Sequence, residues 1–124
     1  MNWQSCTHAL LRIVTGFMIM PHGYQKLFGF GGVGPREGAL PTTAGVIELV
    51  CGAFVLVGFQ TRWAAFLASG LMAAAYFMRH AGDGFWPLLN RGELAALYCF
   101  VFLYLWAHGS GEYSVDSLLK KRKG

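Results

Sequence analysis

Residues 43–59, TAGVIELVCGAFVLVGF, form an apolar stretch with one charged side chain, the carboxylate of Glu48. Three more apolar runs cover residues 6–30, 61–78 and 91–108. A membrane-spanning helix needs about 20 mainly apolar residues, and fewer when its polar ends reach the headgroups. The four runs therefore predict an all-α fold, a transmembrane bundle of four helices in which neighbours are antiparallel.

The amino-acid composition favours a membrane protein. Of the 124 residues, 55% are hydrophobic and 13% are charged, whereas a soluble domain usually carries about 25% charged residues. The 17 glycines fit this interpretation because glycine lets membrane helices approach closely. A small soluble all-helical domain is the alternative. The length predicts one domain, residues 1–124, without room for a separate catalytic domain.

Proline, glycine and capping residues set the expected bounds of the helices. We expect helices over residues 6–28, 43–59, 61–80 and 91–108, followed by a basic tail over residues 112–124. Thr42 or Thr43 would cap the second helix. Pro21 should kink the first helix, because proline removes one backbone hydrogen bond. The glycine-rich residues 28–41 are predicted to form a loop, which could cover a site.

The positive charge lies at the carboxyl end of the chain. The net charge of +4 comes mostly from the run Lys120-Lys121-Arg122-Lys123. Because basic residues concentrate on the cytoplasmic side of membrane helices, we expect a cytoplasmic C-terminus and, after four crossings, a cytoplasmic N-terminus. Nucleic-acid binding is not predicted, since no aromatic or grooved feature accompanies the basic run. Residues 1–4 lack the basic start of a cleavable signal, so the first run is expected to remain a helix.

Six ionisable side chains fall at one end of the predicted bundle. They come from all four helices and comprise His22, Lys26, Glu48, Arg79, His80 and Glu93. Opposite charges at one depth can pair, which lowers the cost of burying them. Because ionisable groups within membrane helices usually mark function, we predict a site at this end.

Two interpretations of these side chains are open. Glu48 either pairs with a base and fixes the helix register, or exchanges a proton with a ligand such as a quinol. In the second case Glu48, Glu93 and His22 are the candidates for proton transfer, and histidine suits that role because it titrates near neutral pH. The candidate ligand-binding residues are Lys26, Arg79 and His80.

Arg12 stands alone inside the first helix, toward the opposite end. Its guanidinium either extends to the lipid headgroups, as long basic side chains do, or faces an anionic ligand. The second interpretation makes Arg12 a further candidate for ligand binding. His8 and His108 fall at the same end, where we expect them to lie at the membrane interface.

Metal and redox centres receive little support from the sequence. Cys6, Cys51 and Cys99 are isolated and form neither a C-x-x-C pair nor a zinc-ligand spacing. His22 and His80 could together ligate haem b, but no other feature of the sequence supports haem. A quinone is one candidate ligand, because quinone sites generally need an apolar slot with a few polar groups at its end.

Several short motifs follow one another in a specific order along the chain. They are Leu11-Arg12-Ile13, His22-Gly23-Tyr24-Gln25-Lys26-Leu27-Phe28-Gly29, Gly45-x-x-Glu48-x-x-x-Gly52, Thr61-Arg62, Phe85-Trp86-Pro87, Gly92-Glu93-Leu94-Ala95 and Gly109-x-Gly111-x-Tyr113-Ser114-x-Asp116. In order and spacing they resemble the DoxX family over nearly the whole chain. The resemblance implies a small four-helix protein of the bacterial inner membrane.

The same resemblance implies a link to redox systems. The family takes its name from a subunit associated with thiosulfate:quinone oxidoreductase or terminal quinol oxidase, and a mycobacterial member is linked to a membrane oxidoreductase complex that handles thiol and superoxide stress. We therefore expect a membrane subunit that works with a partner redox subunit and binds a quinone-like or small anionic ligand. A non-enzymatic accessory or scaffolding protein is the first alternative, and a small-solute transporter is the second. Homo-oligomerisation is open.

Overall fold

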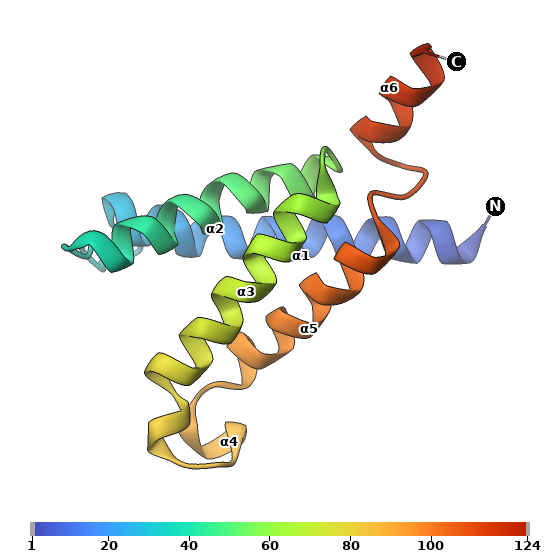
Figure 1. Cartoon of the computed structure of the whole chain (residues 1–124). Coiled ribbons are helices and arrows are strands. Elements are labelled where there is room, and N and C mark those ends of the chain that lie inside the picture. The colour runs from blue at the N-terminus through green and yellow to red at the C-terminus, as the bar shows by residue number, and fades with distance from the viewer. Residues whose placement is uncertain (1, 124) are drawn as a thin grey trace.

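The computed structural model describes residues 2–123, and this part of the chain is helical. The elements are α1 (Trp3–Phe28), α2 (Ala39–Val57), α3 (Thr61–Arg79), the 3-10 helix η1 (Ala81–Asp83), α4 (Pro87–Asn90), α5 (Glu93–His108) and α6 (Val115–Lys123). The prediction of an all-α fold is confirmed. Helix α1 packs along α2, and α3 packs along α5, so that two antiparallel pairs form two layers that cross (Figure 1). Helix α6 projects away from these layers.

The first helix begins earlier than expected because Asn2 caps it. The Asn2 side-chain oxygen accepts hydrogen bonds from the backbone N–H groups of Gln4 at 2.9 Å and Ser5 at 3.3 Å. Such a cap satisfies N–H groups that have no partner within the helix. Helix α1 then continues through Pro21 to its end at Phe28.

The second helix also begins earlier, at Ala39, so the expected start at residue 43 was wrong. Gly38 precedes the helix and has a φ of 111°. Residues that carry a Cβ atom rarely adopt this backbone angle. Pro41 lies in the first turn of α2. A proline costs little there, because the first N–H groups of a helix have no acceptor. The loop predicted over residues 28–41 is therefore shorter.

The fourth long helix, α5, begins at Glu93 rather than at residue 91. Arg91 has a φ of 64°, in the left-handed region, and this residue ends α4 and separates it from α5. The segment between α3 and α5 contains η1 and α4 instead of an irregular loop. The end of the predicted basic tail forms α6, a further helix that the apolar runs did not indicate.

Helices α1 and α2 touch through glycines. A Cβ atom on Gly16 would lie 2.6 Å from the Gly52 carbonyl oxygen, and one on Gly23 would lie 2.5 Å from the Gly45 carbonyl oxygen. Each helix therefore presents two glycines, seven residues apart, to the other. Small residues at such positions let two helix backbones approach closely. Membrane helices depend on this close packing, because the hydrophobic effect does not drive their association within a bilayer.

Gly16→Ala is expected to lower the free energy of unfolding by about 1–3 kcal/mol, because the added methyl group meets backbone atoms that cannot yield. The matched control is Gly70→Ala on α3, where an added Cβ would have no neighbour within 4 Å. The control should be neutral or slightly stabilising, since alanine favours a helix more than glycine does. Thermal unfolding of both variants in detergent measures the difference. Equal melting temperatures would contradict the close contact.

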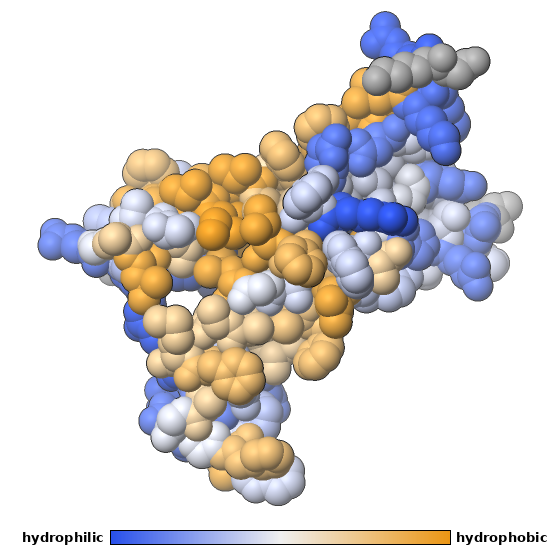
Figure 2. All heavy atoms as spheres, viewed as in Figure 1, coloured by the Kyte–Doolittle hydropathy of each residue, from blue (hydrophilic) through white to orange (hydrophobic). Residues whose placement is uncertain are grey.

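The core lies where the two layers meet. It consists of the buried side chains of Ile19, Cys51, Val55, Ala64, Ala65, Ala68, Met72, Tyr98, Phe102 and Leu105. Apolar residues also cover much of the surface of the layers, whereas hydrophilic residues gather toward α6 and the loop ends (Figure 2). Among the helices of residues 2–123, α2 is long and apolar enough to cross a membrane by composition, and α5 is apolar but shorter.

Candidate ligand site between the helix layers

A cavity of about 320 Å³ lies between the two layers. Its walls come from the C-terminal parts of α1 and α3 and the N-terminal parts of α2 and α5, and Figure 2 shows an opening between the layers at this end. Much of the wall is apolar, including Ile19, Leu71, Met72, Met78 and Leu94. The volume falls at the lower end of the range for small-molecule sites, about 300–1,000 Å³.

Glu48 and Lys26 are two of the polar residues in the cavity wall. The Glu48 side chain is 2% exposed, and its Oε1 forms an ion pair with Lys26 Nζ. Within residues 2–123 this is the only ion pair. The glycine contact between α1 and α2 explains the pairing, because a Cβ on Gly23 would lie 3.1 Å from the Glu48 Cβ. The two helices are thus close enough for Lys26 to reach across.

Two buried oxygen atoms at the cavity have no hydrogen-bond partner among residues 2–123. They are Oε2 of Glu48 and the hydroxyl of Tyr98, whose side chains are 2% and 6% exposed. A buried polar group without a partner costs about 1–3 kcal/mol, and such a group needs an explanation in each case. Both residues line the cavity. The residues of the cavity wall therefore include one acceptor and one hydroxyl without a partner in the described chain.

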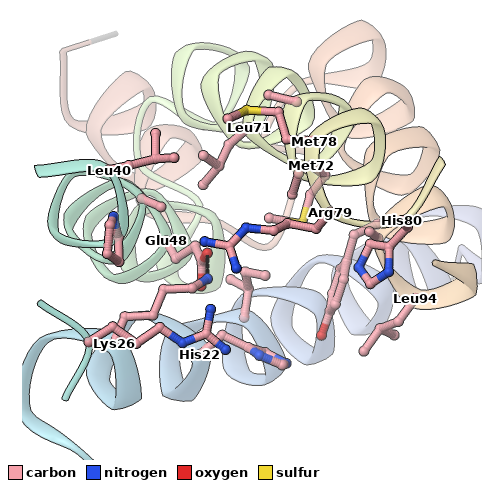
Figure 3. A pocket seen from close by; sticks show the side chains of 18 of the residues that line it. His22, Lys26, Leu40, Glu48, Leu71, Met72, Met78, Arg79, His80 and Leu94 are labelled. Atoms are coloured by element: carbon pink, nitrogen blue, oxygen red, sulfur yellow. Dashed lines mark hydrogen bonds and ion pairs between the residues drawn. The ribbon is translucent and has the colours of Figure 1, made fainter. Parts of the chain in front are cut away.

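The other predicted residues of this end also line the cavity. His22 lies on α1 beside Tyr98, with ring centroids 6.3 Å apart and nearly perpendicular planes. Figure 3 shows Arg79 reaching from the end of α3 toward Glu48, opposite Lys26. Of the six side chains expected together, the structure brings His22, Lys26, Glu48, Arg79 and His80 to one wall. Their roles stay predictions.

His80 is held in place by the segment before α5. Its Nδ1 lies 3.0 Å from the carbonyl oxygen of Asn90. Asn90 is 1% exposed, and its side-chain amide donates hydrogen bonds to the Tyr76 hydroxyl at 3.0 Å and the Gly84 carbonyl at 2.9 Å. Asn90 therefore fixes the short α4 turn against α3, and with it the edge of the cavity.

Glu93 does not line the cavity with the other five side chains, and its role stays a prediction. It is exposed in the first turn of α5 and borders a surface depression with Pro87 and Leu97. The left-handed conformation of Arg91 sets how α5 starts. The charge of Glu93 consequently lies outside the cavity, although its depth along the bundle matches the prediction.

Three cavity residues were missed by reasoning from the sequence. Tyr98 lies in the apolar run of residues 91–108, and its hydroxyl within that run was the available signal. Arg36 lies in the loop after α1, where its backbone N–H donates to the Lys26 carbonyl at 3.0 Å. This bond turns the loop back over the cavity. Arg91 reaches the cavity from the turn before α5.

Arg12 lies at the opposite end and is 2% exposed, so the expectation that it reaches the headgroups was wrong. Its Nε donates to the Val55 carbonyl at 2.9 Å, and its terminal nitrogens donate to the carbonyls of Ser110 at 2.8 Å and Tyr113 at 2.9 Å. A longer contact of 3.5 Å reaches Leu56. Arg12 does not line the cavity; it joins α1 to the end of α2 and to the segment after α5.

His8 is also buried, contrary to the expected interface position. Its ring stacks on that of His108 with centroids 3.7 Å apart. Nearby, Asp116 ties the end of the chain to the α2–α3 turn, because its carboxylate accepts hydrogen bonds from Gln60 N–H at 2.9 Å and the Ser110 hydroxyl at 2.6 Å. The second end of the molecule is therefore closed by polar contacts.

The donors at the cavity suit an organic ligand. Within residues 2–123, no three His, Cys, Asp or Glu side chains are grouped closely enough to hold a metal ion. Cys6, Cys51 and Cys99 are free thiols. The cavity combines one amine, three guanidinium groups, two imidazoles, one amide, one carboxylate and one phenol around an apolar space.

Comparison with known proteins identifies relatives of the chain. Residues 7–81, more than half of the chain, match the family model described as DoxX. An uncharacterized protein of Haemophilus influenzae is 42% identical over 92% of this chain and 91% of its own length. An uncharacterized membrane protein of Mycobacterium tuberculosis is 30% identical over 98% of this chain and 90% of its own length. No solved structure matches the chain significantly.

Proposed function

Because the chain belongs to the DoxX family, we propose that it is a multi-pass protein of the bacterial inner membrane that binds a small quinone-like ligand between its two helix layers. Family membership and the description of the mycobacterial relative as a membrane protein support the association with a bilayer. In this proposal the chain is a subunit of a redox system and exchanges electrons through a partner redox subunit.

The surface of the long helices supports four crossings, by α1, α2, α3 and α5. Each carries large apolar side chains that are exposed on the outside of the layers, such as Phe17, Val50, Phe66 and Phe100. Exposed apolar surface on this scale marks contact with lipid or with another protein. The basic residues of α6 follow α5, which supports cytoplasmic termini under the positive-inside rule. The cavity then lies toward the outer leaflet.

The buried, unpartnered Oε2 of Glu48 carries the ligand proposal. A quinone ring fits an apolar cavity of this size, and its two oxygens need a donor or an acceptor at the wall. The Tyr98 hydroxyl would donate to a quinone carbonyl, and Glu48 Oε2 would accept a hydrogen bond from the hydroxyl of the reduced form.

Glu48→Gln is expected to lower the amount of quinone that co-purifies with the protein by about tenfold, since one hydrogen bond to a charged group is worth about 1.5–3 kcal/mol. The measurement is lipid extraction of the purified protein, followed by quantification of quinone per mole of protein. The same substitution should impair quinone-dependent turnover in membranes that contain the partner subunit.

Glu93→Gln is the matched control for this experiment, because Glu93 starts α5 outside the cavity. It should retain the quinone content of the unmodified protein. An unmodified protein that carries no quinone and binds none on addition would overturn the proposal. Equal losses in both variants would show that the cavity is not where the quinone binds.

A scaffolding role is the second candidate, and the ion pair between Lys26 and Glu48 favours it. A buried pair that joins α1 to α2 can serve helix register alone. In that case Glu48→Gln would lower the yield or the melting temperature and leave the quinone content per folded protein unchanged. The extraction experiment therefore separates the two candidates.

A further inference from the structure

Basic side chains surround the cavity in excess over acids. Lys26 comes from α1, Arg36 from the loop before α2, Arg79 from the end of α3 and Arg91 from the turn before α5. Glu48 is the only carboxylate in the described wall. Four separate parts of the fold thus place a positive charge at one opening.

Three of these charges form no ion pair within the described chain. Glu48 is already paired with Lys26, and no carboxylate oxygen of residues 2–123 lies within 4.0 Å of a nitrogen of Arg36, Arg79 or Arg91. The side chains of these arginines also make no hydrogen bond to another described residue. Like charges that converge without a counter-ion raise the electrostatic potential, and a cleft with apolar walls strengthens this effect.

The apolar wall of the cavity sets a second requirement for the ligand. Behind the arginines the wall is formed by Leu71, Met72, Ala75 and Met78 of α3 and by Ile19 of α1. This surface cannot solvate a small, fully hydrated anion such as phosphate. It suits a molecule that has an apolar body and carries its charge at one end.

We propose that the cavity binds an anionic amphiphile, with the acidic group between Arg36, Arg79 and Arg91 and the apolar body against α3. This inference rests on the proposed ligand site and adds the charge of the ligand. Arginine suits the task, because its planar guanidinium binds acidic oxygens in pairs and stays charged at all relevant pH values. A quinone that carries an acidic hydroxyl group belongs to this class, and so does a lipid with an acidic headgroup.

Two probes of the same shape test the charge. Naphthoquinone is neutral, whereas lawsone is the same ring system with one hydroxyl group that is ionised at neutral pH. Titration calorimetry in nanodiscs of phosphatidylcholine measures the dissociation constant of each. We expect lawsone to bind at least about tenfold more tightly, which is the effect of one charge-assisted hydrogen bond.

Arg79→Gln should remove most of this preference by weakening lawsone about tenfold, with a much smaller effect on naphthoquinone. Arg62→Gln is the matched control, because Arg62 is exposed at the opposite end of the same helix. It should leave the binding of both probes unchanged. Circular dichroism of each variant confirms that the helical fold is retained.

The outcomes separate this inference from the proposed function. Binding of neither probe overturns both proposals. Binding of naphthoquinone without a preference for lawsone, or a preference that persists in Arg79→Gln and in Arg36→Gln/Arg79→Gln, overturns the anionic ligand and leaves the quinone site standing.

The source of the acidic group is a further result of the same titration. Nanodiscs that contain phosphatidylglycerol supply a lipid headgroup as a competitor. Weaker lawsone binding to the unmodified protein in these nanodiscs, without the same loss in Arg79→Gln, identifies an anionic lipid as the occupant. Unchanged lawsone binding identifies a free acidic amphiphile. Both results support an anionic ligand.

Discussion

Arg12→Leu is expected to lower the free energy of unfolding by more than about 3 kcal/mol, because each hydrogen bond from a charged donor to a buried acceptor is worth about 1.5–3 kcal/mol. The guanidinium donates to carbonyls of Val55, Ser110 and Tyr113. Leucine fills part of the space and removes the donor from the carbonyls of Ser110 and Tyr113, whereas the Val55 carbonyl still accepts from the Gly58 backbone N–H at 3.2 Å. Thermal unfolding in detergent, followed by circular dichroism, measures the loss.

Arg12→Lys tests whether the geometry or only the charge matters. A lysine ammonium keeps the positive charge but cannot reproduce the planar fork that reaches carbonyls on two sides. We expect a melting temperature between those of Arg12→Leu and the unmodified protein. A fully stable Arg12→Leu variant would show that the carbonyl contacts contribute nothing and would support the headgroup interpretation that the structure contradicts.

Lys26→Met is expected to cost about 3–5 kcal/mol, the usual result of removing one partner from a buried ion pair. The reason is the Glu48 carboxylate, which then has no counter-ion although it is 2% exposed. Glu48→Gln should cost much less, because Lys26 is partly exposed and its ammonium can turn toward water. We therefore expect the two single variants to differ in stability, with a larger loss in Lys26→Met than in Glu48→Gln.

The double variant Lys26→Met/Glu48→Gln should recover most of the stability that Lys26→Met loses. Neutral side chains of similar volume often replace a buried pair at little cost. A double-mutant cycle of melting temperatures and unfolding free energies gives the coupling directly. Additive effects of the two substitutions would contradict a pair in which one charge depends on the other.

The helices could be predicted because apolar runs and punctuation residues are local properties of the sequence. The ends of the helices were harder to predict from the sequence. Asn2 and Gly38 set two of them through the backbone geometry before the helix, and Pro41 lies in a first turn that tolerates proline. The segment before α5 depended on a left-handed Arg91. A run of hydrophobicity does not reveal that conformation.

The sequence predicted how far along the bundle each candidate side chain lies, but not whether that side chain points into the cavity. Counting residues along antiparallel helices places Glu48 and Glu93 at one end of the bundle, and this argument is independent of packing. The direction in which each side chain points depends on the rotation of its helix. Gly23 and Gly45 set that rotation for Glu48 through a backbone contact, whereas α5 turns Glu93 away from the cavity.

Arg12 shows the limit of reasoning from residue types. Its partners are backbone carbonyl oxygens, which every residue possesses, so no sequence motif indicates which residues they belong to. Two of these partners, Ser110 and Tyr113, follow α5 near the end of the chain. Only the folded arrangement shows that the first helix depends on the last segment.

This dependence bears on the biosynthesis of the protein. The first helix leaves the ribosome with a guanidinium whose Ser110 and Tyr113 acceptors are not yet translated. Until those residues emerge, the nascent chain carries an unsatisfied positive charge in its opening segment. Synthesis of residues 110–113 thus supplies two of the carbonyls that the Arg12 guanidinium binds, and the first helix can reach its final contacts only after that point.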